Sequence, residues 1–334
     1  MKKILNRKIL LFFIIFSAFL YLNNSSIFRK EQEGVPFLLA HRGMSQTFPM
    51  EEITAQTNTA AIIFEPDHPY LENTIPSIKE AFRLGADMVE FDIQLTKDGI
   101  FAVFHDAVLE YRTNGEGHVS EYEMDDLKKL DIGYGYTADN GKSHPFRGKG
   151  IGLMPSLDEV FTEFQDNSFL IHIKRNDARE GEALARYLKN LPETRLDKLA
   201  VYGGDKPVAV LKQEIRGLRV MSRATLKKAV TDYMLLGWAG IMPESMKNTV
   251  IIIPLRYARF LWGWPHCFTR RIKNAGSLFI LVSGKGKWSE GFDSEEDLTR
   301  LSSRYKGGIW TNRIDRIGPI LKNNLQTERY SDET

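Results

Sequence analysis

Two carboxylates and an imidazole lie on either side of a tight turn in the segment EFDIQLTKDGIFAVFHD, residues 90–106. Glu90 and Asp92 are two residues apart in a strand-like run, so their side chains should point to the same face. The TKDG segment that follows is typical of a turn. An antiparallel return across it pairs residue numbers that sum to roughly 195, which brings His105 level with the acids. The segment therefore predicts a β-hairpin with an imidazole beside two carboxylates.

Same-face carboxylates at the carboxyl end of a strand are suitable ligands for a hard divalent cation such as Mg²⁺ or Ca²⁺. In isolation, such a pair is more often only the polar face of a half-exposed strand. Two other strand-like runs add polar groups, because His41 ends FLLAH and Lys174 ends SFLIHIK. If these strands are parallel, all these polar groups meet at one end of one sheet. The whole set then indicates a functional site more strongly than any one of its residues does alone.

The chemistry of this set suits phosphodiester cleavage. His41 and His105 offer a general acid and a general base near neutral pH. Arg42 offers a planar donor for a phosphate group, and Lys174 a point charge. Cleavage of a phosphodiester requires that the negative charge on the phosphate be neutralised and that protons be transferred. Cationic side chains and a bound cation neutralise the charge, and imidazoles transfer the protons. The formal net charge of +2 does not fit a nucleic-acid-binding protein.

The sequence predicts alternating strands and helices as the elements that position these residues. NTIPSIKEAFRLG predicts a helix that Thr74 caps and Gly85 ends, and SLDEVFTEF opens with Ser156 and Glu159 at capping-box spacing. We expect eight parallel strands, which predicts a (β/α)8 TIM-type barrel. The competing doubly wound sheet is disfavoured, because no G-x-G-x-x-G follows the first strand. The eight strands are expected near residues 37, 88, 169, 199, 218, 240, 278 and 308.

These residues also match a family pattern over about residues 37–316. In this order, the chain resembles the glycerophosphodiester phosphodiesterase family through His41-Arg42-Gly43, Glu72-Asn73-Thr74, Glu90-Phe91-Asp92, His105-Asp106, RTNGEG and GGIWTNRID. The resemblance implies a TIM-type barrel that hydrolyses glycerophosphodiesters to sn-glycerol 3-phosphate and an alcohol. It also implies that His41 and His105 act as acid and base, and that Glu90 and Asp92 bind a divalent metal ion. The implied mechanism passes through a cyclic phosphate formed by the glycerol 2-hydroxyl.

The chain departs from the family pattern at three places. His172 stands where the family usually has a glutamate, which is the expected third metal ligand. A neutral imidazole there should weaken Mg²⁺ or Ca²⁺ and favour Mn²⁺ or Zn²⁺, unless His172 is simply packed and does not ligate. Residues 44–71 form a long insert, in which Glu51, Glu52, Glu65 and Asp67 either replace the missing carboxylate or remain solvated. The seventh strand ends in LVSGKG, so contacts to the alcohol group should differ.

The N-terminus predicts a membrane-directed segment. MKKILNRK is basic and precedes the apolar run Ile9–Leu22, which is shorter than the about 20 residues of a usual span. No clean cleavage site follows, so we expect a signal anchor, with a cleaved signal peptide and secretion as the alternative. The basic flank places the rest of the chain outside the cytoplasm. We expect a membrane segment at 1–30, the barrel domain at 31–325 and a polar tail at 326–334.

Segment 249–273 mixes large apolar and aromatic residues with arginines. It is interpreted either as an apolar loop and helix packed on the barrel or as an element that touches lipid. Lipid contact would suit a phospholipase C- or D-like hydrolase that acts on membrane lipids. A third hypothesis is a catalytically weak barrel that binds phosphodiesters or lipids.

Overall fold

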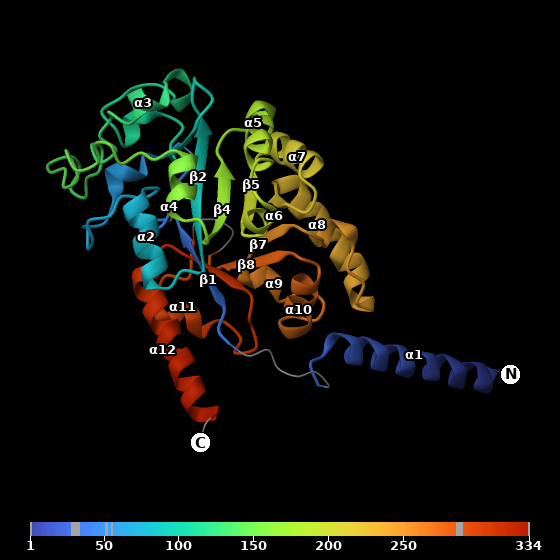
Figure 1. Ribbon diagram of the computed structural model, residues 1–334. Coiled ribbons are helices and arrows are strands. Elements are labelled where there is room, and N and C mark those ends of the chain that lie inside the picture. The colour runs from blue at the N-terminus through green and yellow to red at the C-terminus, as the bar shows by residue number, and fades with distance from the viewer. Residues whose placement is uncertain (1, 28–33, 51–52, 55, 285–289, 333–334) are drawn as a thin grey trace.

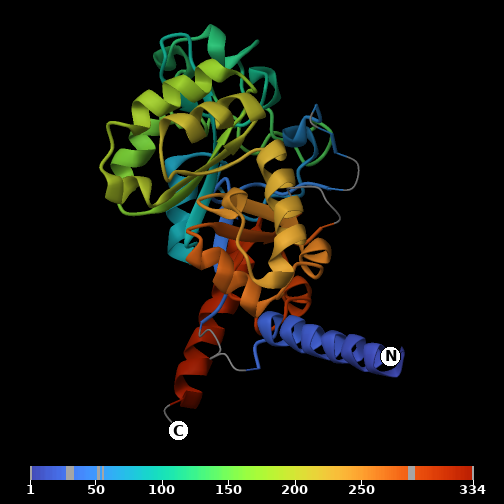
Figure 2. The same ribbon diagram turned by 90° about the vertical axis from the view of Figure 1, so that its right-hand side faces the viewer.

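The computed structural model describes residues 2–27, 34–50, 53–54, 56–284 and 290–332, with side chains from residue 7 to residue 323. Eight parallel strands form a nearly closed barrel in the order β6-β5-β4-β2-β1-β9-β8-β7. A single parallel bridge between Val220 and Thr249 joins the two end strands. Helices follow the strands and cover the outside of the sheet, as Figures 1 and 2 show. The predicted TIM-type barrel is therefore confirmed.

The elements alternate along the chain. The strands are β1 Phe37–His41, β2 Met88–Leu95, β3 Phe101–Val103, β4 Ser168–Ile173, β5 Leu199–Gly203, β6 Arg219–Met221, β7 Val250–Pro254, β8 Leu278–Val282 and β9 Gly308–Thr311. The α-helices are α1 Lys2–Asn24, α2 Ile75–Leu84, α3 Met124–Leu127, α4 Leu157–Glu163, α5 Ala178–Leu188, α6 Glu193–Leu196, α7 Asp205–Glu214, α8 Arg223–Leu236, α9 Leu255–Ala258, α10 His266–Asn274, α11 Glu295–Thr299 and α12 Ile314–Asp332. Short 3-10 helices include η1 Thr59–Ile62, η2 Leu109–Tyr111, η3 Val119–Glu121, η4 Gly237–Ala239 and η5 Glu244–Met246.

Local sequence signals explain several of these boundaries. Thr74 accepts a hydrogen bond from Ser77 N at the start of α2, and Gly85 ends the helix in the left-handed region. Ser156 and Glu159 form the predicted capping box of α4. The predicted hairpin is also present, because β3 pairs antiparallel to β2 with Ile93 opposite Val103. The two residue numbers in each pair of this hairpin sum to 196, close to the predicted sum of roughly 195.

One predicted strand is wrong. The segment near residue 240 forms η4 and a loop, and the strand lies instead at β7, Val250–Pro254. β-Branched residues dominate β7, and its Val250, Ile251 and Ile252 are buried. Segment 249–273 therefore begins as a core strand of the barrel, and α9 and α10 follow it.

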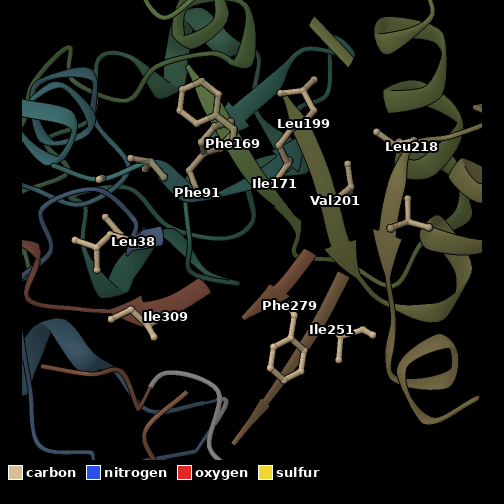
Figure 3. Close-up of a cluster of buried hydrophobic side chains, with 14 of the residues drawn as sticks. Leu38, Phe91, Phe169, Ile171, Leu199, Val201, Leu218, Ile251, Phe279 and Ile309 are labelled. Atoms are coloured by element: carbon tan, nitrogen blue, oxygen red, sulfur yellow. The ribbon is translucent and has the colours of Figure 1, made fainter. Parts of the chain in front are cut away.

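The barrel strands alternate between two apolar layers. Outward-facing side chains such as Phe91, Phe169, Val201 and Ile251 pack beneath the helices, as Figure 3 shows. Inward-facing side chains such as Met88 and Leu170 fill the barrel interior. Because side chains on a strand alternate, the next inward positions toward the carboxyl ends fall at the barrel mouth.

Candidate active site

The seven residues predicted from the sequence meet at the mouth of the barrel. The inward-facing series that buries Met88 and Leu170 continues with Glu90, Asp92 and His172, and His41 ends β1 beside them. A cavity of about 360 Å³ opens there. Its lining residues include five of the predicted ones, namely His41, Arg42, His105, His172 and Lys174. The structure places the candidate residues together, but their catalytic and ligand roles remain predictions.

Glu90, Asp92 and His172 form a candidate metal-binding group. Their donor atoms all lie within 4.8 Å of one another. Burial beside Asp92 raises the pKa of Glu90 above its ordinary value. Two adjacent buried carboxylates with an imidazole are a donor set that a divalent cation would complete, because the cation would offset their mutual repulsion. The residues present therefore fit the ion that the sequence predicts.

Lys174 and Arg42 lie against the same carboxylates. Lys174 Nζ is 3.4 Å from Asp92 Oδ1, and Arg42 Nε is 3.2 Å from Asp92 Oδ2. Burial opposes ionisation of Asp92, but Lys174, His105 and Arg42 together hold its pKa well below the ordinary value. Asp92 is therefore an anion in a positive environment, and the two cations beside it line the cavity.

Arg42 owes its position to an unusual backbone conformation. Its φ of 57° is in the left-handed region, and Gly43 follows with φ 75°. This turn lets Arg42 Nη1 donate to Glu72 Oε1 at 2.8 Å, while Arg42 N donates to Glu90 Oε2 at 3.3 Å. The turn after β1 thus fixes the guanidinium between the buried acids Glu72 and Asp92, and the backbone of the same residue against Glu90.

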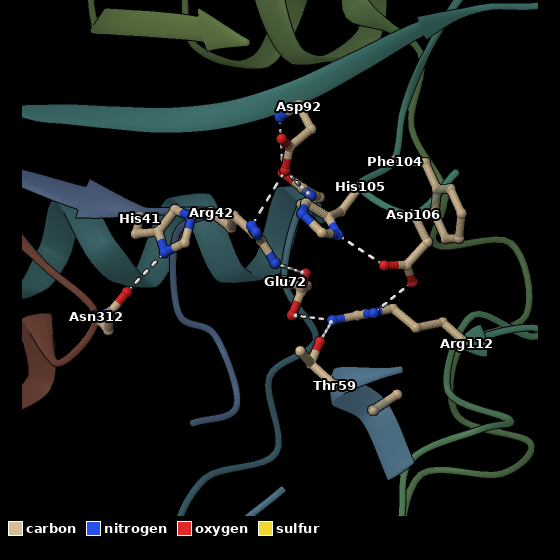
Figure 4. A network of polar contacts seen from close by, with 12 residues as sticks. His41, Arg42, Thr59, Glu72, Asp92, Phe104, His105, Asp106, Arg112 and Asn312 are labelled. Carbon is tan, nitrogen blue, oxygen red and sulfur yellow. Dashed lines mark hydrogen bonds and ion pairs between the residues drawn. The ribbon is translucent and has the colours of Figure 1, made fainter. Parts of the chain in front are cut away.

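The two imidazoles have different partners, as Figure 4 shows. His41 Nδ1 lies 2.7 Å from Asn312 Oδ1, and Asn312 Nδ2 donates to Asp293, which fixes the orientation of the amide. Because an amide oxygen only accepts, His41 carries its proton on Nδ1 and leaves Nε2 free. His105 Nδ1 lies 2.7 Å from the carboxylate of Asp106. Both rings therefore present an unprotonated Nε2.

Burial lowers the pKa of both histidines. The pKa of His41 is well below its ordinary value because of burial and the neighbouring Arg42. Burial, Arg42 and Lys174 lower the pKa of His105 to about 4, although Asp92 and Asp106 oppose this. A carboxylate stabilises an imidazolium better than an amide does, so His105 is the better proton acceptor of the two.

Three residues that sequence reasoning did not assign to the site support it. Arg112 holds Asp106 and Glu72 in an ion-paired network, and it donates to Thr59 Oγ1 at 2.9 Å. Tyr202 donates to Glu90 Oε1 at 2.7 Å, and its ring stacks on His172 at 4.1 Å. Arg112 and Asn312 lie in the motifs RTNGEG and GGIWTNRID, which could have pointed to them. Tyr202 lies in no such motif, and the available signal was its inward-facing position near the end of β5.

The long insert does not supply the missing carboxylate through its described acids. Asp67 pairs with Arg313 at 2.6 Å, and Glu65 is exposed. Glu51 and Glu52 lie outside the described residues, as does the Lys285-Gly286 end of LVSGKG. The insert reaches the site instead through Thr59 of η1, which contacts Arg112.

The sequence of this chain is similar to those of glycerophosphodiester phosphodiesterases. The sequence pattern of the glycerophosphoryl diester phosphodiesterase family matches residues 41–230. A glycerophosphodiester phosphodiesterase from Caldanaerobacter subterraneus is 36% identical over 137 residues, which cover 41% of this chain and 44% of that protein. The chain thus aligns with less than half the length of this relative.

Two solved structures share the fold. A glycerophosphodiester phosphodiesterase from Agrobacterium tumefaciens superposes with a TM-score of 0.56 at 19% identity, over 85% of this chain and 100% of that one. A phosphodiesterase from Oleispira antarctica, solved with the product sn-glycerol-3-phosphate, gives a TM-score of 0.50 at 19% identity over 83% and 93%. At such identities the likeness establishes the barrel fold.

Proposed function

This chain belongs to the glycerophosphoryl diester phosphodiesterase family, and from that premise we propose that it hydrolyses glycerophosphodiesters to sn-glycerol 3-phosphate and an alcohol. The observation that carries the proposal is the pair of differently partnered histidines beside a buried acidic cluster in one cavity. The product bound to the Oleispira antarctica phosphodiesterase is of the same class.

We assign the proton transfers from the partners of the two rings. His105, backed by Asp106, takes the proton from the glycerol 2-hydroxyl as its oxygen attacks phosphorus. Before this step His41 takes a proton from solvent on Nε2, because the neutral ring carries its only proton on Nδ1. The bond from phosphorus to the alcohol oxygen breaks, and His41 gives that oxygen the Nε2 proton, because its amide partner holds an imidazolium less firmly. In the second step the roles reverse, and water opens the cyclic phosphate to give glycerol 3-phosphate.

The other groups bind charge. Arg42 and Lys174 would hold the phosphate oxygens. Glu90, Asp92 and His172 would hold a divalent ion, with Mn²⁺ or Zn²⁺ suited to the imidazole and Mg²⁺ or Ca²⁺ as alternatives. Such an ion, when bound, withdraws electron density from the phosphoryl group. Tyr202 would keep Glu90 and His172 in place.

The test is hydrolysis of glycerophosphocholine by the purified protein with Mn²⁺, Mg²⁺, Ca²⁺ or Zn²⁺. We expect His41→Ala and His105→Ala each to lower the rate by about 10²–10⁴-fold, because each removes a proton-transfer group. His144→Ala, at a histidine outside this cavity, is the matched control and should retain activity. No turnover with any metal, together with retained binding of the substrate, would replace this proposal with the binding-module hypothesis.

The N-terminal helix supports a proposal about location. By length and composition, residues Arg7–Asn24 of α1 are long and apolar enough to cross a membrane. We infer that α1 is a signal anchor and that the barrel lies outside the cytoplasm, as the basic flank predicts. Recovery of the full-length protein in the membrane fraction, with the barrel accessible only from outside, would support this topology; a cleaved, secreted form would contradict it.

A further inference from the structure

The carboxyl end of α1 is seated in a binding site built by the barrel. Arg271 of α10 is buried, and its guanidinium donates to Asn23 O at 2.9 Å and to Asn24 Oδ1 at 3.1 Å. In return, the side-chain amides of Asn23 and Asn24 both donate to Trp238 O. A buried arginine needs several acceptors, and α1 supplies two of them. The helix end is therefore part of the packed structure and not a loose tether.

The same junction continues along the helix. The ring of Trp238 contacts the rings of Phe16 and Phe19 at centroid distances of 5.7 and 6.4 Å. The thiol of Cys267 also donates to Ser25 O at 3.2 Å. These contacts set the direction in which α1 leaves the barrel, as Figure 2 shows.

Exposed apolar side chains lie on both sides of Trp238 in the sequence. Met234, Leu235 and Leu236 form the last turn of α8, and Ile241 follows η4; we call these four residues the apolar collar. Their exposed fractions are 39, 66, 40 and 51%. Clustered apolar exposure of this kind marks an interaction surface rather than ordinary solvent-facing surface.

The neighbouring helix identifies the occupant of the collar as a lipid bilayer. Side chains from Ile9 to Leu22 of α1 are mostly exposed and apolar, so α1 itself calls for an apolar environment. The 18-residue window Arg7–Asn24 would be about 27 Å long, close to the thickness of a bilayer core. Where the end of this helix is fixed, the adjacent collar must meet the membrane surface.

The junction lies at the opposite end of the barrel from the active site. Ser222 and Arg223, at the start of α8, line the cavity. The helix then runs for 14 residues, about 21 Å, before η4 begins. In Figure 1, α1 joins the body beyond the lower end of α8 and runs roughly across the direction of β2 and β4, which point upward to the mouth.

We propose that Arg271, Trp238 and the apolar collar seat the barrel on the membrane by the end opposite its mouth, so that the mouth opens into the aqueous phase. This inference rests on the proposed function and topology and adds the phase from which the substrate reaches the site. The site lies at the other end of α8 from the collar, about 21 Å along the helix, so it receives glycerophosphodiesters from the aqueous phase and bilayer phospholipid does not reach it. The phospholipase-like alternative is thereby disfavoured.

The test places an environment-sensitive fluorophore on the full-length protein in vesicles of phosphatidylcholine and phosphatidylglycerol that contain lipid-borne quenchers. Leu235→Cys labels the collar and Asp125→Cys labels α3 on the mouth side, both in a Cys267→Ser background that keeps a donor for Ser25 O. We expect quenching at position 235 and none at position 125. Equal or reversed quenching would overturn the proposal, as would protection of position 235 by self-association in detergent without lipid.

A second arm tests the seat of the helix. Asn23→Ala/Asn24→Ala removes side-chain contacts of α1 and leaves the bonds of Arg271 within the barrel intact. It should lower the quenching at position 235, while Ser17→Ala, at an exposed position of α1, should not. Unchanged quenching in the double variant would show that the seat does not orient the barrel.

The substrate arm uses the same vesicles. We expect hydrolysis of added glycerophosphocholine and no turnover of the phosphatidylcholine in the bilayer. Turnover of bilayer lipid would contradict the orientation. If position 235 is quenched but glycerophosphocholine is not hydrolysed, the membrane seat stands and the proposed activity fails.

Discussion

His172 places a neutral ring where the family pattern has a carboxylate, and its surroundings are arranged for that ring. Its Nδ1 lies 2.8 Å from Asp92 Oδ1, and one face stacks on Tyr202. Burial and Lys174 lower the pKa of His172 to about 4, so the imidazole is neutral at physiological pH. A neutral nitrogen is a donor that Mn²⁺ and Zn²⁺ accept more readily than Ca²⁺ does.

Exchanging this residue should change which ion supports activity. We expect His172→Glu to raise the activity ratio of Ca²⁺ or Mg²⁺ over Mn²⁺ by roughly tenfold or more, because it adds a negative charge to the donor set. Metal titrations of activity, and of binding by calorimetry, measure the ratio. Tyr202→Phe keeps the stacking but removes the bond to Glu90, and serves as the comparison. A ratio unchanged in His172→Glu would indicate that position 172 does not touch the ion.

Glu180 offers a separate test of residue electrostatics, away from the active site. This side chain is 3% exposed, and its Oε1 accepts a hydrogen bond from Leu95 N at 3.3 Å. Burial raises the pKa of Glu180 to about 7 from an ordinary 4.5. The folded protein thus binds more protons than the unfolded chain between these values, so the free energy of unfolding should fall as pH rises through this window.

Glu180→Gln removes the group that titrates. The variant should be more stable than the parent protein by about 1–3 kcal/mol at pH 8, and the difference should shrink toward pH 5. Urea unfolding at several pH values measures it. Glu182→Gln, at an exposed position of α5, should follow the parent protein at every pH. A constant difference across the pH range would mean that Glu180 does not titrate as described.

At the scale of elements, the turn from β1 toward α2 determines where Arg42 lies. Gly43 has φ 75°, and a Cβ atom there would lie 2.7 Å from Ser77 Oγ and 2.8 Å from Ser77 C in the first turn of α2. The glycine therefore allows the close approach of the loop to the helix as well as the left-handed conformation.

A pair of glycine variants separates these two effects. Gly99 has φ 82° but open space around the position of its Cβ, so Gly99→Ala should cost only the conformational strain of about 1 kcal/mol. Gly43→Ala should cost about 2–4 kcal/mol and also lower activity, because α2 and Arg42 must move apart. Denaturant unfolding and the hydrolysis assay measure both. Equal costs for the two variants would exclude the close contact as the reason for Gly43.

Elements with strong local signals could be predicted from the sequence. Thr74, Gly85 and the Ser156–Glu159 pair marked helix ends correctly, and the TKDG turn predicted the β2–β3 register closely. Strand β7 was misplaced because VIIIP precedes a segment rich in aromatic and basic residues, which obscured its β-branched run. Period-two alternation is absent from strands buried on both faces, so strand positions there depend on tertiary packing.

The candidate site followed the same rule. Its members were predicted where type and strand position coincide, as for Glu90, Asp92 and His172. Tyr202 and the seat at Arg271 were not found, because a tyrosine at a strand end and an arginine in a helix are common. Only the fold shows that these side chains face Glu90 and α1.

At the scale of the whole molecule, the barrel has one weak seam. Among the residues that the structure describes, seven neighbouring strand pairs are joined by ladders, but β6 and β7 pair only at the Val220–Thr249 bridge. There the hydroxyl of Thr249 donates to Val220 O at 2.7 Å. Ser222, at the cavity wall, lies just beyond this seam. Opening of the barrel should therefore start here and disturb the site from this side.

Thr249→Val tests the contribution of the seam, because it keeps the shape of the side chain and removes the donor. Since Val220 O would then be buried without its partner, we expect a loss of about 1–3 kcal/mol in the free energy of unfolding. Amide hydrogen exchange should increase in β6 and β7 before it increases in β2 and β4. Thr249→Ser retains the hydroxyl and should exchange nearly as slowly as the parent protein at the seam. Exchange that rises equally in all eight barrel strands would show that the barrel opens as one cooperative unit, with closure spread over the whole sheet.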